Sequence, residues 1–97
     1  MRSEKALEKR LGEDVKAVGG LSIKMPATYF AGLPDRVCLF PEGVCVFAEV
    51  KTAGKKPTKL QNLVHKKIRA LGFHVYIIDS LSSLETLLND VERIRFT

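Results

Sequence analysis

The run Val44-Cys45-Val46-Phe47-Ala48-Glu49-Val50-Lys51 decides the fold of this chain. Its apolar and β-branched composition predicts a buried β-strand. Burying an unpaired charge is costly, so a carboxylate and an ammonium near the end of such a strand indicate a place where charge is needed. Because side chains alternate faces along a strand, Glu49 and Lys51 are expected to project from the same side.

A second strand precedes this run and is expected to pair with it. Residues 40–44 suit a three-residue hairpin loop, because Pro41 can start a type I turn and Gly43 can take the left-handed conformation. The resulting register places Asp35 opposite Glu49. Directly opposed side chains share a face, with their Cβ atoms roughly 4.5–5.5 Å apart.

Two carboxylates placed so closely repel each other unless a cation or a proton lies between them. Hard oxygen ligands of this kind suit Mg²⁺ or Mn²⁺. Asp35 and Glu49, with Lys51 beside them, are therefore predicted to hold a divalent metal ion and to activate a water molecule. Taken singly, each residue also fits a turn or an edge-strand charge, and a register slip of one residue would turn Asp35 to the other face. The joint pattern favours the metal site.

The composition is that of one small globular domain spanning residues 1–97. The net charge of +5 favours an anionic partner, of which nucleic acid is the commonest. The two cysteines, Cys38 and Cys45, are interpreted as small buried hydrophobes because they do not face each other across the proposed hairpin. No apolar run approaches the roughly 20 residues that span a bilayer, and the charged N-terminal segment is unlike a signal peptide. A cytoplasmic location is expected.

The remaining elements follow from periodicity and capping signals. Ser3 can cap a first helix, Thr58 and Gln61 have the form of a capping box, and Ser82 or Ser83 could start a last helix. The expected elements are a helix from Ser3 to about Val18, strands 21–25, 35–40 and 44–51, a helix from Thr58 to about Leu71, a strand 73–78, a helix through Leu84 to Val91, and an edge strand or tail at 93–97.

This order predicts an α/β fold with a mixed β-sheet flanked by helices on both faces, in the order αβββαβ with a final helix. The strand 73–78 should lie parallel to the strand 44–51, because the helix between them forms a right-handed crossover.

Several of these segments together resemble the VRR-NUC family of the PD-(D/E)xK nuclease superfamily, in its stand-alone phage and bacterial form. The residues that carry the resemblance are Gly32-Leu33-Pro34-Asp35-Arg36, Phe47-Ala48-Glu49-Val50-Lys51, Gln61, and Leu71-Gly72-Phe73-His74-Val75-Tyr76. The similarity covers nearly the whole chain. It implies a restriction-endonuclease-like core and cleavage of DNA phosphodiester bonds with Mg²⁺ or Mn²⁺.

The resemblance also implies a role for each matching residue. Asp35 and Glu49 would be metal ligands together with the backbone carbonyl of Val50, and Lys51 would position the attacking water and steady the charge on the phosphate. Gln61 would support the lysine or the bound phosphate, in addition to its capping box.

The family further uses a glutamate from the first helix as a metal ligand, for which both Glu4 and Glu8 are candidates. Glu8 is favoured, because first-turn stabilisation of the helix dipole already explains Glu4.

DNA contacts are expected from lysines after the catalytic strand and on the following helix, which would track the backbone by charge and shape. They are Lys55, Lys56, Lys59 and Lys66, with Lys67 and Arg69 as further candidates. For Lys66, Lys67 and Arg69 taken singly, a solvated helix face is the simpler explanation. His65 lies one turn after Gln61 and could touch DNA, although an exposed surface histidine is the commoner case.

Small members of the family are associated with branched DNA, especially four-way (Holliday) junctions. Two symmetric cuts need two active sites, so a homodimer is expected, with the loop 26–32, including Tyr29 and Phe30, or the last helix as candidate contact surfaces. Two alternatives to the nuclease remain open: a nuclease-fold module that binds DNA without cleaving it, and a small α/β partner protein whose charge cluster is incidental.

Overall fold

A computed structural model describes residues 3–26, 30–52 and 54–97. The elements follow the order α1 (Glu4–Ala17), β1 (Leu21–Lys24), β2 (Arg36–Phe40), the short 3₁₀ turn η1 (Pro41–Gly43), β3 (Val44–Val50), α2 (Lys59–Ala70), β4 (His74–Ile78) and α3 (Leu81–Arg95). The predicted α/β order is therefore confirmed. In the described parts of the chain, no helix is long and apolar enough to cross a membrane.

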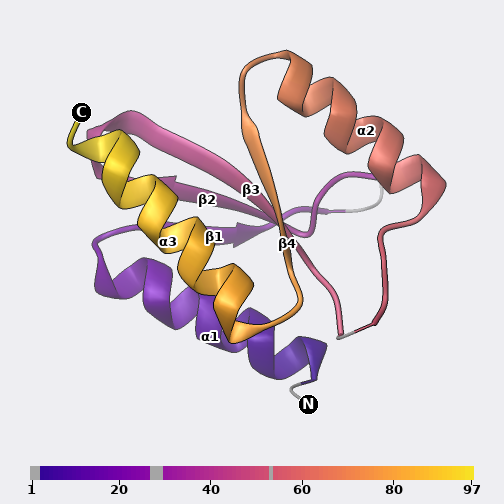
Figure 1. Ribbon diagram of the computed structural model, residues 1–97, viewed down its shortest axis with the longest axis horizontal. Helices are drawn as coiled ribbons and strands as arrows, with labels where there is room; N and C mark the ends of the chain where they lie inside the picture. The colour runs from indigo at the N-terminus through magenta and orange to yellow at the C-terminus, as the bar shows by residue number, and fades with distance from the viewer. Residues whose placement is uncertain (1–2, 27–29, 53) are drawn as a thin grey trace.

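The four strands form one mixed sheet in the order β1-β2-β3-β4 (Figure 1). β2 and β3 pair antiparallel with Val37 opposite Phe47 and Phe40 opposite Val44, as the hairpin loop predicted. β3 and β4 pair in parallel, and α2 forms the crossover between them.

The hairpin loop differs from the prediction in one residue. Gly43 has a positive φ of 74°, as expected, but Glu42 also has a positive φ of 65°. Its carboxylate accepts a hydrogen bond of 3.0 Å from Nε of Arg95 at the end of α3. The contact joins residues far apart in sequence, so a turn rule based on the local sequence does not include it.

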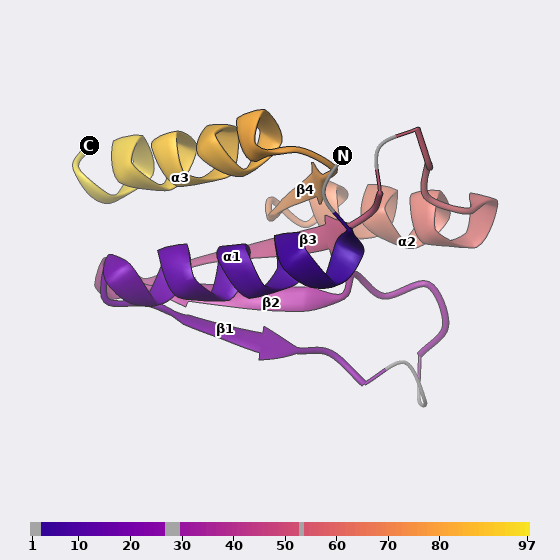
Figure 2. The same ribbon diagram turned by 90° about the horizontal axis from the view of Figure 1, so that it is seen from below.

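The core lies between one face of the sheet and two helices. α1 packs against β1, β3 and α3, and α3 also packs against β3 and β4. Figures 1 and 2 show α1 and α3 alongside each other, with α2 apart from them beyond β4. The buried residues of this core are Leu7, Leu11 and Val15 of α1, Cys38 and Phe40 of β2, Val46, Ala48 and Val50 of β3, Ile78 of β4, and Leu84, Leu87 and Val91 of α3.

The opposite face of the sheet is covered only in part. α2 packs against β4, and Phe73, just before β4, meets Phe47 edge to face with ring centroids 5.9 Å apart. On this face, the side chains of Leu21 and Ile23 in β1 and of Leu39 in β2 are at least 40% exposed. Leu21 and Leu39 are cross-strand partners, so these side chains form one apolar strip.

The start of the last helix corrects one prediction. α3 begins at Leu81 with Ser80 as its N-cap and a capping box to Ser83, rather than at Ser82 or Ser83. It continues to Arg95, so residues 93–95 are helical and not an edge strand. Both cysteines, Cys38 and Cys45, are free thiols.

Candidate active site

Asp35 and Glu49 meet at the end of the β2–β3 hairpin, on the face opposite α1 and α3. Asp35 directly precedes β2, where its carbonyl accepts a hydrogen bond of 2.7 Å from the backbone N–H of Met25. Pro34 before it is fully buried and fixes the chain entering the strand. The register of the hairpin, continued by one pair, sets Asp35 against Glu49, so the sequence prediction of opposed carboxylates follows from the observed pairing.

Asp35 is tied to β3 by its side chain. Its Oδ2 accepts a hydrogen bond of 2.8 Å from the backbone N–H of Val50. The N–H and C=O groups of one strand residue point to the same side of the strand, so the carbonyl of Val50 is directed toward the side on which Asp35 lies. Two carboxylates and this carbonyl make a set of hard oxygen atoms at the end of the sheet.

Glu49 is the buried charge at the centre of the site. Only 1% of its surface is exposed. Its Oε2 accepts a hydrogen bond of 3.1 Å from Nε2 of Gln61 and lies 3.3 Å from Nζ of Lys51. Burial, and next the negative charge of nearby Asp35, raise the pKa of Glu49 to about 7, although Lys51 acts in the opposite direction. A cation between the carboxylates would remove this penalty.

Gln61 links the helix cap to the site. Its Oε1 accepts a hydrogen bond of 2.9 Å from the backbone N–H of Thr58, and Thr58 Oγ1 accepts one of 3.2 Å from the N–H of Gln61. This is the predicted capping box. Because the amide oxygen is used for the cap, the amide nitrogen is directed at Glu49. The partner of Gln61 is therefore the carboxylate rather than Lys51.

His65 is a site residue whose environment the sequence did not predict. It is fully buried, and its Nε2 lies 3.7 Å from Oε1 of Glu49. Burial, together with the positive charges of Arg69 and Lys51, lowers the pKa of His65, so the imidazole is neutral. The interpretation of His65 as a surface histidine is wrong. Its spacing of four residues from Gln61 was the signal that could have placed it at the site.

Glu8 does not join the two carboxylates. It lies on α1, which packs on the other face of the sheet, and its Oε2 accepts a hydrogen bond of 2.9 Å from Nη2 of Arg36 and lies 3.5 Å from Nζ of Lys24. Partial burial opposes its ionisation, but Arg36 and Lys24 outweigh burial and hold the pKa of Glu8 below its ordinary value. The prediction of Glu8 as the third carboxylate is therefore not met. Within residues 3–26, 30–52 and 54–97, no group of three or more His, Cys, Asp or Glu side chains is arranged to hold a metal ion.

The oxygen set still fits a magnesium or manganese ion. Mg²⁺ commonly binds through one or two carboxylates and keeps several of its water molecules, so Asp35, Glu49 and the Val50 carbonyl suffice. Lys51 lies beside Oε2 of Glu49, while Oε1 has no hydrogen-bond partner and could accept a further ligand.

The four candidate DNA contacts are all exposed. Lys55 and Lys56 are exposed on the loop after β3, Lys59 is exposed in the first turn of α2, and Lys66 is exposed further along that helix. Arg69 instead donates a hydrogen bond of 2.8 Å from Nη2 to the carbonyl of Val75, which gives it a structural role. Tyr29, a candidate for dimer contacts, lies outside the described residues.

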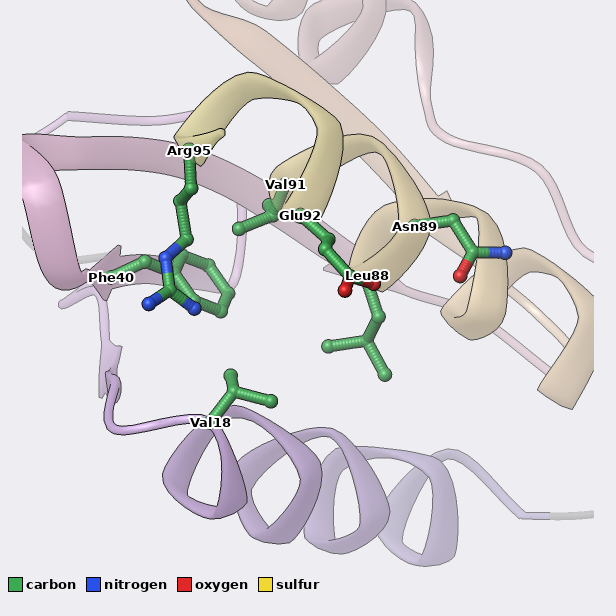
Figure 3. A pocket seen from close by; sticks show the side chains of 7 residues that line it. All are labelled: Val18, Phe40, Leu88, Asn89, Val91, Glu92 and Arg95. Carbon is green, nitrogen blue, oxygen red and sulfur yellow. The ribbon is translucent and has the colours of Figure 1, made fainter. Parts of the chain in front are cut away.

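A separate pocket lies away from this site, between the C-terminal ends of α1 and α3 (Figure 3). It is bordered by Val18, Phe40, Leu88 and Arg95. Phe40 faces the side of the sheet that α1 and α3 cover. It lies at the opposite end of β2 from Asp35, and a strand of this length separates the two residues by about 16 Å. The pocket has no paired carboxylates and does not contribute to the candidate active site.

One known protein is similar to this chain in sequence, and one solved structure is similar to it in fold. "Putative nuclease p44" of Acyrthosiphon pisum secondary endosymbiont phage 1 is 38% identical over 88 residues, which are 89% of this chain and 95% of the relative. A solved structure described as a VRR_NUC domain matches with a TM-score of 0.83 at 31% identity, covering 89% of this chain and 94% of that one. No family model matches the sequence.

The four-stranded mixed sheet with acidic side chains and a lysine at its end defines an α/β nuclease domain. More specifically, the chain belongs to the VRR-NUC family.

Proposed function

We propose that this protein is a metal-dependent, structure-selective endonuclease that hydrolyses phosphodiester bonds in branched DNA, with four-way junctions as the preferred substrate. One observation carries the proposal: Asp35 and buried Glu49 lie together at the end of the sheet, with the Lys51 ammonium 3.3 Å from Oε2 of Glu49. Two carboxylates beside a lysine provide what phosphodiester hydrolysis needs, namely a cation site and a donor for developing negative charge.

Each residue has a distinct task in this reaction. Asp35, Glu49 and the carbonyl of Val50 would hold Mg²⁺ or Mn²⁺. When bound, the metal ion supplies Lewis-acid polarisation of the scissile phosphate and lowers the pKa of a water molecule. Lys51 extends from the same strand face as Glu49, where its ammonium orients the attacking water and stabilises charge on the phosphate oxygens.

Gln61 orients Glu49 rather than touching the substrate. Its amide hydrogen bond to Oε2 limits rotation of the carboxylate, and the capping box fixes the amide in turn. The exposed lysines on the β3–α2 loop and on α2 would contact the DNA backbone by charge, without reading base identity.

A homodimer accounts for paired cuts across a symmetric junction, because each copy of this chain carries one site. The apolar strip of Leu21, Ile23 and Leu39 supports a contact with a second copy, since exposed apolar patches commonly mark protein interfaces. α3 is less suited to this contact than expected, because Leu84, Leu87 and Val91 face the core.

Leu39→Lys should convert the dimer to a monomer in sedimentation experiments, whereas Leu71→Lys, at an exposed leucine outside the strip, should not.

The test is incubation with labelled junction, flap, nicked and linear DNA in the presence of Mg²⁺ or Mn²⁺. Wild-type protein should cut the junction in preference to the others. Glu49→Ala should abolish cleavage while binding to the junction survives in EDTA or Ca²⁺. Binding without cleavage by the wild type would instead favour a silent DNA-binding module, and cleavage confined to linear ends would exclude the junction as substrate.

A further inference from the structure

Three buried side-chain atoms in the described parts of the chain have no hydrogen-bond partner, and all three belong to one pair of residues. They are Oε1 of Glu49 and the two ring nitrogens, Nδ1 and Nε2, of His65. Leaving a buried polar atom unpaired is costly, because its hydrogen bonds to water are lost and not replaced. Their concentration at the candidate active site, rather than in the core between the sheet and α1, points to a functional arrangement of these two side chains.

The spacing of residues on α2 brings His65 to Glu49. Gln61 and His65 are four residues apart, so their side chains lie one above the other on the same face of the helix. Gln61 binds Oε2 of Glu49, and Nε2 of His65 lies 3.7 Å from Oε1. Each oxygen of the carboxylate therefore faces a different side chain of α2.

We propose that His65 is a positioning residue for Glu49, donating its Nε2–H to Oε1 so that α2 holds both oxygens of the carboxylate. The proposal rests on the function proposed above. The separation of 3.7 Å exceeds a hydrogen bond, and it must shorten by about 0.8 Å to reach the usual length. Hydrogen bonds in active sites are often long in the free enzyme and shorten when the reactive complex forms.

The imidazole acts on the orientation of the carboxylate. Ligand side chains in metal sites are commonly held by hydrogen bonds from neighbouring groups, and loss of such a partner lowers metal affinity by about 10–100-fold. Gln61 already holds Oε2, and once Nε2 of His65 closes on Oε1 the plane of the Glu49 carboxylate is fixed for the bound cation. His65 does not touch the substrate in this arrangement.

A purely structural role for His65 predicts different results from the same variants. If the ring only fills space, His65→Leu should be well tolerated, because leucine is apolar and of similar size. If the ring donates to Oε1, His65→Gln should recover function, because the glutamine amide nitrogen can occupy the position of Nε2, and His65→Leu should not.

The first experiment measures Mn²⁺ affinity by calorimetry on the DNA-free protein. His65→Leu should weaken Mn²⁺ binding about 10–100-fold, and His65→Gln should recover most of that loss. His74→Leu is the matched control, because His74 is exposed at the start of β4 and should leave affinity unchanged. Wild-type affinity in His65→Leu would overturn the positioning role. Absence of Mn²⁺ binding by the wild type would instead overturn the proposed function.

The second experiment needs no substitution of His65. The chain has two histidines, so nitrogen NMR of the imidazole rings can assign both. His65 should be neutral with its proton on Nε2, and the Nε2 signal should shift when Glu49→Gln is introduced or Mg²⁺ is added, while His74 stays constant. A proton on Nδ1, or a His65 signal insensitive to Glu49→Gln, would overturn the inference whether or not His65→Leu folds.

Discussion

At the scale of single residues, the site depends on a carboxylate that the fold keeps buried. Glu49 follows a run of apolar strand residues, and its hydrogen bond to Gln61 and its ion pair with Lys51 both lie on Oε2. A buried carboxylate near a second one is costly when both are ionised. This cost predicts that the stability of the free protein depends on pH and on divalent cations.

Stability of the metal-free protein should fall as the pH rises. The pKa of Glu49 is raised to about 7 in the folded chain from 4.5. A carboxyl group whose pKa is higher in the folded than in the unfolded chain contributes stability at low pH. That stability is fully present below pH 4.5 and is lost as the pH rises through about 7. The change amounts to at most about 3 kcal/mol.

Denaturant unfolding in EDTA from pH 4 to pH 8.5 measures this slope. Glu49→Gln should flatten the pH dependence, and Mg²⁺ at pH 8 should stabilise the wild type more than the variant. Equal slopes for the two proteins would show that Glu49 is not the titrating group.

Glu8 tests a different prediction at the same scale. In the structure it pairs with Arg36 and Lys24, so Glu8→Gln should cost about 1 kcal/mol of stability. Cleavage should change little. Glu4→Gln is the control on the first turn of α1: it should leave cleavage unchanged and should lower stability only by the loss of its interaction with the helix dipole. A drop in both Mn²⁺ affinity and cleavage for Glu8→Gln alone would mean that Glu8 leaves Arg36 and reaches the metal in the complex with DNA.

At the scale of elements, α2 combines a capping box with support for the site. Gln61→Glu keeps an acceptor for the Thr58 N–H, because glutamate also forms capping boxes, but it replaces the amide donor with a second carboxylate against Glu49. Cleavage should fall by about 10–100-fold, as when a ligand residue is deprived of its hydrogen-bond partner. Thr58→Ala should instead lower the stability by about 1 kcal/mol and leave cleavage unchanged.

Thermal unfolding and single-turnover cleavage of the same two variants separate these roles. If Thr58→Ala lowered cleavage as much as Gln61→Glu, the cap itself would control the site. Loss of activity in Gln61→Glu through unfolding alone would appear as a fall in the melting temperature.

Gly32 allows α2 to pack closely against the loop that leads to Asp35. Gly32 has a φ of +88°, and a Cβ there would lie 2.8 Å from Cγ2 of Val64 and 3.0 Å from the carbonyl oxygen of Leu60. Gly32→Ala should therefore destabilise the fold by about 2 kcal/mol or more, through backbone strain and displacement of α2. Gly12→Ala, inside α1 with open space around it, should stabilise by about 0.4–1 kcal/mol.

Denaturant titration of these two variants measures both effects. An unchanged midpoint for Gly32→Ala would show that α2 adjusts freely relative to the loop.

Sequence alone predicts the elements whose signals are local. The apolar run of β3, the turn residues of the hairpin and the Thr58–Gln61 box determined the order, the register and the position of Asp35 opposite Glu49. Features that depend on tertiary packing were predicted less well. His65 is polar by composition, and its burial follows from α2 covering Glu49. Glu8 has the right helix position, but the fold places it beside Arg36.

At the scale of the whole molecule, α1 and α2 lie on opposite faces of the sheet, and both carry exposed lysines (Figures 1 and 2). A net charge of +5 would attract DNA to either face. If the proposed function holds, the position of Asp35 and Glu49 favours DNA binding on the face that α2 covers. A competing groove with Lys5, Lys9, Lys24 and Arg36 lies along α1.

Two triple variants with equal changes in net charge distinguish these faces. Replacing Lys55, Lys56 and Lys59 with Gln should weaken junction binding and reduce the salt dependence of log K by about 1 for each phosphate that is no longer bound. Replacing Lys5, Lys9 and Lys16 with Gln, which lowers the charge equally, should leave the salt slope near the wild-type value. Binding titrations from low to moderate salt in Ca²⁺ measure both slopes without cleavage. The opposite result would place the DNA along α1, close to Glu8 and Arg36, and would move the cleavage site with it.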